Sequence, residues 1–187
     1  MPKLFIKNMV CNRCIMVVRN ELEKLGFQPT LVELGEVILA DDISVSDKTK
    51  IAHHLETFGF EILDNTNTQL IQKIKTILID LVQNKNNDIR LNLSDYLKEK
   101  LHQNYSKISN LFSEVEGISI EKYFINLKIE KVKELIVYDE LSFTEIADLL
   151  NYSSVAHLSS QFKKVTGVSP SYFKKLKGNK RIQIDKL

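Results

Sequence analysis

Two stretches of this chain repeat one another at a spacing of fifty residues. Residues 108–123 read ISNLFSEVEGISIEKY, and residues 158–173 read LSSQFKKVTGVSPSYF. At that spacing apolar residues fall on apolar residues, and both copies continue with Gly, then Ile or Val, then Ser. Two copies are too few for a solenoid. We therefore expect each copy to be a small tri-helical unit, with one long helix connecting the two.

Helical periodicity extends over the whole C-terminal part of the chain. From Gln69 onward apolar residues recur every three to four positions, as on a helix with one buried face. The pattern predicts helices over residues 69–83, 94–101, 105–116, 120–138, 142–150, 154–166 and 170–176. Ser142 and Glu145 form an S-x-x-E capping box, and Pro170 stands at a first helical position. Residues 69–178 are thus predicted to be an all-α domain of about seven helices.

Each copy places a short helix, a tight turn and a second helix before the Gly-[Ile/Val]-Ser sequence, which is the arrangement of a helix-turn-helix. In the second copy Ala147 is the small residue where two helices cross, and Asn151 suits a left-handed turn. In the first copy the Ala147 position falls on Leu97 or Lys98, depending on a one-residue gap, and His102 stands near the turn.

The predicted connecting helix, residues 120–138, has a length that suits DNA. Its 19 residues span roughly 28 Å at about 1.5 Å per residue. One turn of DNA is roughly 34 Å long. Two second helices held at its ends can therefore enter successive major grooves on one face of the duplex.

Charge separates the chain into two parts. Residues 1–66 carry 7 Lys and Arg against 10 Asp and Glu, whereas residues 67–187 carry 19 against 14. From Lys163 onward there are 8 basic residues and one acid, Asp185. A cationic C-terminal part is typical of a phosphate-binding module, although a solvated lysine-rich tail would look the same. We assign residues 179–187 to a basic tail.

The first part of the chain alternates strand-like and helix-like segments. Strands are predicted over residues 4–6, 30–34, 37–40 and 60–63, and helices over residues 14–25 and 46–58. The order βαββαβ predicts an α+β ferredoxin-like sandwich over residues 1–64. Residues 65–68 are polar and are predicted to be a linker.

The segments LSFTEIADLLNY, residues 141–152, and FKKVTGVSPSYF, residues 162–173, resemble the C-terminal signature of the AraC/XylS family of bacterial transcription regulators. The resemblance covers about residues 69–177. It implies seven helices with two helix-turn-helix units, in each of which the second helix reads the bases of double-stranded DNA.

The resemblance also implies positions for DNA contacts. The base-reading candidates of the first unit are Ser106, Ser109 and Asn110, with Tyr105 and Lys107 beside them. Those of the second unit are Val155, Ala156, Ser159 and Ser160. Because these side chains are short, we expect thymine-methyl contacts, water bridges and DNA shape to share the discrimination. The phosphate candidates are Lys163, Lys164, Lys174, Lys175 and Lys177.

A pair of cysteines lies in the first part of the chain. Cys11 and Cys14 follow a predicted strand and open a predicted helix, where backbone N–H groups and the helix dipole favour thiolate. Soft thiolates suit Cu(I) or Zn(II). The M-x-C-x-x-C motif in a βαββαβ pattern resembles the heavy-metal-associated domain of copper chaperones and metal pumps, in which both cysteines bind the metal. Redox sensing and a scaffold with unused thiols stay open as alternatives.

We therefore expect a DNA-binding transcription regulator whose N-terminal domain responds to a soft metal ion or a thiol signal. The alternative is a metal-trafficking, metallochaperone-like protein whose helical part docks on a partner. An enzyme is not expected, because the sequence has no Gly-rich phosphate loop, no suitably placed carboxylate pair and no nucleophile elbow. No apolar run is long enough for a membrane span or a secretory signal, so we expect a cytoplasmic protein without a membrane partner. Contact with RNA polymerase, homodimer formation, and activation or repression are left undecided by the sequence.

Overall fold

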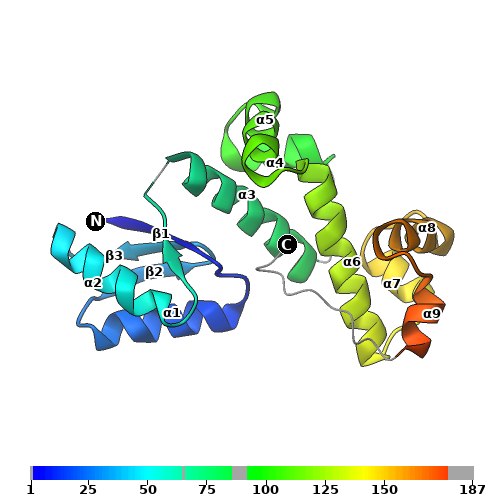
Figure 1. Ribbon diagram of the computed structural model, residues 1–187, viewed down its shortest axis with the longest axis horizontal. Coiled ribbons are helices and arrows are strands. Elements are labelled where there is room, and N and C mark those ends of the chain that lie inside the picture. The colour runs from blue at the N-terminus through cyan, green and yellow to red at the C-terminus, as the bar shows by residue number, and fades with distance from the viewer. Residues whose placement is uncertain (1, 65, 86–91, 177–187) are drawn as a thin grey trace. The chain divides into compact units, whose positions relative to one another are not determined.

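The computed structural model describes residues 2–64, 66–85 and 92–176. Its internal contacts divide the chain into two compact units, Met1–Thr76 and Ile77–Leu187. Figure 1 labels the helices and the strands β1, β2 and β3. Within the described ranges, no helix is long and apolar enough to cross a membrane. The predicted α+β N-terminal part and all-α C-terminal part are both observed.

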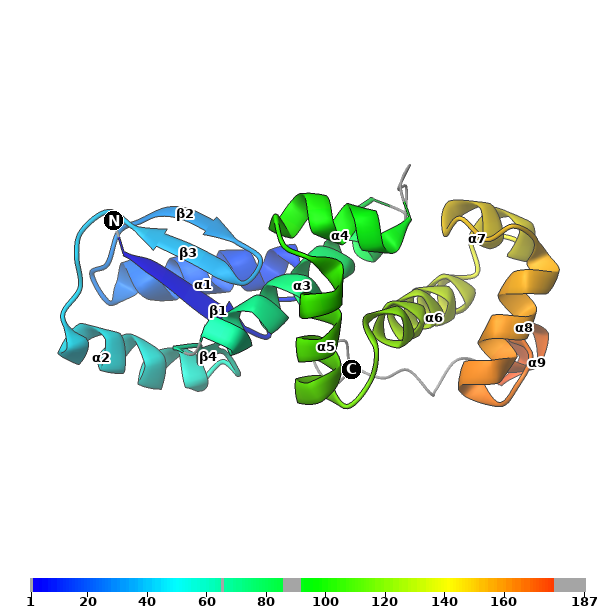
Figure 2. The same ribbon diagram turned by 90° about the horizontal axis from the view of Figure 1, so that it is seen from above.

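The first unit is a small sheet with two helices. Its elements are β1 (Lys3–Lys7), α1 (Asn12–Lys24), β2 (Pro29–Glu33), β3 (Glu36–Leu39), α2 (Val45–Glu56) and β4 (Glu61–Ile62). The strands lie in the order β2-β3-β1-β4, and each neighbouring pair is antiparallel. Helix α1 contacts β2, α2 contacts β4, and the two helices contact each other, so both cover one face of the sheet (Figure 2).

Alternating and helical spacing of apolar residues builds the core of this unit. Leu4 and Ile6 point inward from β1, as the period of two in a half-buried strand requires. Val18 and Leu22, one turn apart on α1, are fully buried beneath the helix. The remaining buried core residues come from β2, β3, α2 and the connections before α1 and β4: Met9, Val32, Val37, Leu39, Ile51, Leu55 and Phe60.

The element boundaries differ slightly from those predicted. Helix α1 begins two residues earlier than expected, because Cys11 takes the N-cap position. Strand β4 is confined to two residues. Residues 66–68, predicted as linker, form the first turn of α3 (Thr66–Gln83). The division between the two compact units falls later in this helix, between Thr76 and Ile77.

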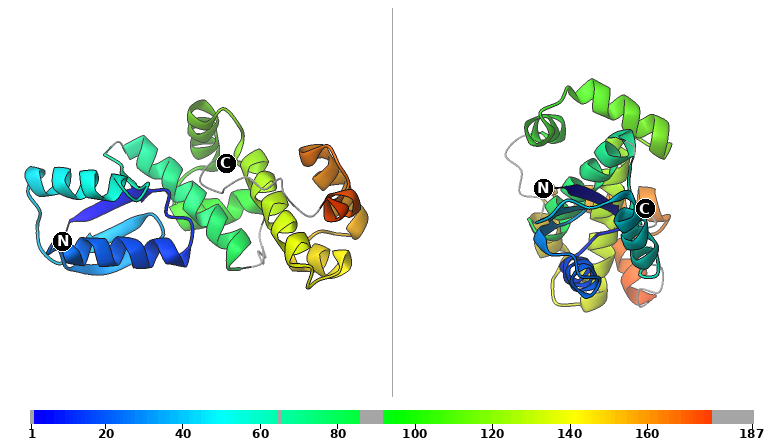
Figure 3. Two further views of the ribbon diagram at one scale, coloured as in Figure 1. Left: turned by 60° about the horizontal axis from the view of Figure 1, so that its bottom comes forward. Right: turned by 90° about the vertical axis from the view of Figure 1, so that its left-hand side faces the viewer.

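The second unit consists of helices around α6. After α3 come α4 (Leu93–Leu101), α5 (Tyr105–Glu116), α6 (Ile120–Tyr138), α7 (Phe143–Leu149), α8 (Val155–Thr166) and α9 (Pro170–Lys175). Helix α5 packs on the first part of α6, where the rings of Phe112 and Tyr123 meet edge to face. Helices α8 and α9 pack on its last part (Figure 3). Ile129, Val132 and Ile136 of α6 belong to the core that they share.

The repeated Gly-[Ile/Val]-Ser sequence has the same structural role in both copies. Gly117 ends α5 with φ +70°, and Gly167 ends α8 with φ +81°, a left-handed conformation that glycine adopts without steric cost. Two residues later, Ser119 and Ser169 are the N-caps of α6 and α9 and accept bonds from backbone N–H groups. Each copy therefore ends one helix and begins the next within three residues.

Candidate nucleic-acid interface

The second repeat forms a helix-turn-helix from α7 and α8. Helix α7 begins at the predicted capping box, in which Ser142 and Glu145 each bond the other's backbone N–H. Asn151 turns the chain with φ +53°, as predicted for a left-handed position. Ala147 is 1% exposed, consistent with close helix crossing at this point. Ser154 then caps α8 by accepting the backbone N–H of His157 at 3.1 Å.

Helix α8 buries one face and presents the other. Leu158 and Phe162 are fully buried, and the ring of Phe162 meets that of Phe173 at 5.5 Å. Of the base-reading candidates, Ala156 and Ser160 are exposed. Val155 and Ser159 are half-buried, and Val155 also packs against the apolar core. The four residues therefore lie on or beside the solvent-facing side of α8, whereas their contacts with bases stay a prediction.

Two further residues of this face were not predicted. His157 is exposed between Ala156 and Ser160, and its Nδ1 lies 3.1 Å from the hydroxyl of Ser153. Gln161 is half-buried, and its Oε1 accepts the hydroxyl of Tyr152 at 2.7 Å. His157 stands three residues before Ser160, so helical spacing alone could have indicated it.

The first repeat forms a second helix-turn-helix from α4 and α5, with a turn one residue shorter. His102 has φ +50° and takes the left-handed role that Asn151 has in the second unit. His102 precedes the first residue of α5 by three positions, whereas Asn151 precedes that of α8 by four. Counting back from the turn, Lys98 therefore occupies the Ala147 position, which decides between Leu97 and Lys98.

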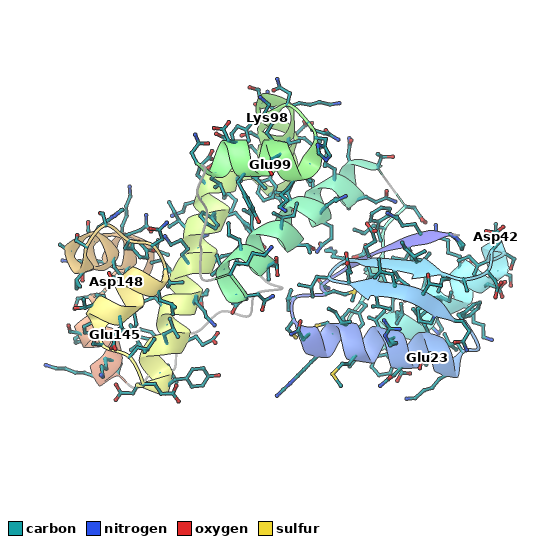
Figure 4. All side chains as sticks on the ribbon, turned by 180° about the vertical axis from the view of Figure 1, so that it is seen from behind. Glu23, Asp42, Lys98, Glu99, Glu145 and Asp148 are labelled. Carbon is teal, nitrogen blue, oxygen red and sulfur yellow. The ribbon has the colours of Figure 1, made fainter. Side chains whose placement is uncertain are left out.

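This alignment leaves a different packing in the first unit. Lys98 is exposed, whereas Leu97 is fully buried and anchors α4. Figure 4 shows Lys98 and Glu99 on α4, and Glu145 and Asp148 on α7, the first helices of the two units. The two units therefore share backbone architecture but not the residue at their helix crossing.

Helix α5 presents most of its predicted residues to solvent. Ser106, Lys107 and Asn110 are exposed, and Ser109 is half-buried. The hydroxyl of Tyr105 donates to the carboxylate of Glu121 on α6. Burial, followed by this bond, raises the pKa of Tyr105 above its ordinary value. The Tyr105 hydroxyl is thus engaged inside the protein, and reading a base with it requires breaking that bond.

Positive charge is unequal between the two units. Residues 143–176 carry 4 Lys against 2 acids, whereas residues 93–116 carry 3 Lys against 4 acids. Lys163 and Lys164 lie in the last turn of α8, and Lys174 and Lys175 in that of α9; all four are exposed. Lys174 also pairs with Asp139 at the end of α6. Lys177 and the predicted basic tail lie outside the described residues.

The two thiols lie close together at the start of α1. Their Sγ atoms are 3.5 Å apart, with Cys11 exposed and Cys14 half-buried. Partial burial opposes thiolate formation at Cys11, but hydrogen bonds from Cys14 and Arg13 and the Arg13 charge outweigh it and lower the pKa of Cys11. Burial, together with the neighbouring Cys11, raises the pKa of Cys14. The pair therefore contains one more acidic, accessible thiol and one less acidic, shielded thiol.

Cys11 and Cys14 are the candidate metal ligands of the N-terminal unit. In the parts of the chain that are described, no cluster of three or more His, Cys, Asp or Glu side chains is placed to hold a metal. Structural zinc sites almost always use four ligands, of which the pair would supply half. The Nε2 of His54 on α2 is engaged by the Glu21 carboxylate on α1 at 2.8 Å. Cys11 and Cys14 are therefore the side chains here that could hold a soft metal ion.

The helices of the second unit have counterparts among known proteins. Residues 97–176 match a protein-family model described as "Helix-turn-helix domain". The chain is 23% identical over 115 residues to the "Uncharacterized HTH-type transcriptional regulator YtdP" of Bacillus subtilis (strain 168), covering 61% of this chain and 15% of that protein. It is 23% identical over 125 residues to the "Msm operon regulatory protein" of Streptococcus mutans serotype c, covering 67% of this chain and 44% of that protein.

These relatives are longer proteins, and the chain spans less than half the length of either. Among solved structures, the chain resembles the C-terminal domain of AraT, a response regulator from Geobacillus stearothermophilus, with a TM-score of 0.52 at 22% identity. The likeness covers 64% of this chain and 92% of that one, and it concerns the fold. Sequence and fold thus agree that the C-terminal unit is similar to the helix-turn-helix domains of transcription regulators.

Proposed function

We propose that the protein is a sequence-specific DNA-binding transcription regulator of the AraC/XylS type. The observation that carries this proposal is the pair of helix-turn-helix units on α6, in a segment that matches a helix-turn-helix family model. Each unit leaves polar or small side chains of its second helix facing solvent. A second helix exposed in this way is the element that enters the major groove.

The geometry suits a duplex read along one face. Helix α6 has 19 residues, so it separates the two units by roughly 28 Å at about 1.5 Å per residue, close to the roughly 34 Å of one DNA turn. Double-stranded promoter DNA is therefore the proposed partner. We propose RNA polymerase and a second copy of the chain as the further partners of such a regulator.

The two helix-turn-helix units contribute unequally to the proposed DNA binding. The second unit carries the excess of lysines, and its exposed Lys163 and Lys164 follow directly on the face with Ala156 and Ser160. Lysine contacts to phosphate raise affinity without choosing sequence. We therefore assign most of the electrostatic affinity to α8 and α9, and a smaller share to α5.

For the N-terminal unit, Met1–Thr76, we propose a ferredoxin-like sandwich of the heavy-metal-associated type that responds to a soft ion or a thiol signal. The order βαββαβ and the strand order β2-β3-β1-β4 support the fold. The adjacent Cys11 and Cys14 support the site, and Cu(I) fits the two soft donors better than Zn(II) does. Titrating copper and zinc into wild type and the C11S/C14S variant tests it, because unchanged affinity in the variant would remove these thiols from the proposal.

DNA binding can be tested with fragments selected from genomic DNA by the purified full chain. We expect fluorescence anisotropy to give an affinity that falls steeply with salt concentration. Replacing Lys163 and Lys164 with Gln should weaken binding to all sequences and reduce the salt slope by about two. The K48Q/K50Q variant, with both substitutions on α2 of the N-terminal unit, is the matched control. It should leave the DNA affinity and its salt slope unchanged. Absence of binding to any selected fragment at low salt would refute the proposal.

A further inference from the structure

The ring of Tyr152 is contacted from three directions in the second helix-turn-helix unit. The ammonium of Lys128, from α6, lies 3.8 Å from the ring centroid. The ring of His157 meets it edge to face at 5.3 Å, and the Tyr152 hydroxyl donates to Gln161 at 2.7 Å. Tyr152 itself is 6% exposed. One buried ring thus connects the long helix α6 to two residues of α8.

Lys128 is an unusual lysine because the residue is buried and its ammonium lies against aromatic rings. The residue is 8% exposed, and within the described ranges no ion pair joins it to a carboxylate. Its second aromatic neighbour is Phe124, at 6.0 Å. A charge removed from water is costly unless it is compensated, and the face of a tyrosine ring attracts a desolvated cation. The cation therefore constrains where the Tyr152 ring can lie.

The position of Tyr152 in turn decides what α8 offers to a partner. Because the Gln161 amide oxygen accepts the tyrosine hydroxyl, the amide NH₂ stays available as a donor. His157 is held at its other side by the hydroxyl of Ser153. Gln161 follows directly on Ser160, and His157 lies one turn before it, so both border the face predicted to read bases.

We infer that Lys128 is a positioning residue for DNA recognition by the second unit: it holds Tyr152, and through Tyr152 it orients Gln161 and His157 on α8. The DNA part of this inference rests on the proposed function. With its oxygen occupied, the Gln161 amide donates to acceptors on DNA, such as guanine N7 and O6 or a phosphate oxygen. Lys128 affects this contact without touching DNA.

Among the described residues of the first helix-turn-helix unit, no tyrosine stands at the position equivalent to Tyr152. Counted from the left-handed turn residue, the position of Tyr152 is taken by Gln103, whose Oε1 is buried and has no hydrogen-bond partner in the structure. The relay from Lys128 through Tyr152 to α8 is therefore a feature of the second helix-turn-helix unit. Its loss should weaken the DNA contacts of α8 and leave those of α5 intact.

Variants of the full chain separate the relay from general stability. K128M keeps the length of the side chain and removes its charge, K128R keeps a cation that can stack on the ring, and Y152F keeps the ring and removes the hydroxyl. K131M on the same helix and Y138F, an exposed tyrosine of α6, are the matched controls. All are compared below their unfolding temperatures, which circular dichroism establishes.

We expect K128M to weaken DNA binding about tenfold and Y152F about fivefold. K128R should restore affinity to within about threefold, and both controls should stay within about twofold. The dependence of affinity on salt should keep its slope in K128M, because no phosphate contact is lost. A slope reduced by about one would mean that Lys128 contacts phosphate, and it would overturn the inference.

A second measurement needs no DNA. In ¹⁵N-labelled protein, the side-chain amide signal of Gln161, assigned with Q161A, should shift in both K128M and Y152F and stay in place in K131M and Y138F. An unshifted Gln161 signal in K128M overturns the inference whatever the affinities are. If wild type binds no DNA at low salt, the proposed function fails, while the Gln161 signal still decides whether Lys128 positions α8.

Discussion

Truncating the buried leucine of α4 tests how the first helix-turn-helix unit is assembled. Leu97 is the residue of α4 that is fully buried, whereas its neighbour Lys98 is exposed. Replacing a buried Leu with Ala costs about 2–5 kcal/mol, because the apolar contacts are lost and a cavity remains. At about 3 kcal/mol, L97A should lower the Tm of the C-terminal unit, Ile77–Leu187, by about 10–15 °C. Exposed substitutions away from special features usually change stability by less than about 0.5 kcal/mol, so K98A should leave the Tm nearly unchanged.

Differential scanning calorimetry of wild type, L97A and K98A checks this pair. The reciprocal variant A147K places a lysine at the buried crossing of α7 and α8. It should destabilise the C-terminal unit more than L97A does, because it both overpacks the crossing and buries a charge. A neutral L97A together with a destabilising K98A would refute the alignment of the two turns through His102 and Asn151. It would also mean that the gap between the repeats lies elsewhere.

Three further outcomes follow from the structure. G117A and G167A should each lower the free energy of unfolding by about 1–2 kcal/mol in urea titrations, because an added Cβ meets nothing within 4 Å and the cost is the left-handed φ alone; a neutral effect would contradict that backbone conformation. Burial lowers the pKa of Lys128 to about 8, so the unfolded chain binds this proton more tightly and stability should rise between about pH 8 and 10.5; the pH profile of K128M should lack this rise, and identical profiles would contradict it. At pH 7.5 iodoacetamide should modify Cys11 faster than Cys14, because the pKa of Cys11 is lowered and that of Cys14 is raised; mass spectrometry of digested protein checks the order, and equal rates would count against the asymmetry.

Sequence predicted the repeat helices well because their ends are set locally. Helices α5 and α6 have the predicted bounds, since Gly117 and Ser119 end one and cap the other through bonds to neighbouring residues. The start of α3 was missed because residues 66–68 are polar and carry no helical periodicity, although they form its first turn. Local capping is visible in a sequence, whereas a polar first turn held by the rest of a helix is not.

Contacts between distant positions account for what could not be predicted at the site. Tyr105 on α5 bonds Glu121 on α6, 16 positions away, and Tyr152 in the turn before α8 contacts Lys128 on α6, 24 positions away. Neither tyrosine can be matched to its partner from the sequence. An isolated lysine on a helix is usually solvated. The exposed positions of α8 were predictable from helical spacing, while the constraint on their orientation required the packed structure.

Hydroxyl-radical footprinting of the full chain on a genomic fragment that it selects tests the central claim most directly. Two helix-turn-helix units held by α6 should protect two segments on one face of the duplex, with centres about one helical turn apart. The segment assigned to α8 should lose protection first as salt is raised in K163Q/K164Q, because its phosphate contacts are reduced. Protection of a single segment, or none at low salt, would contradict DNA reading by a tandem pair of units.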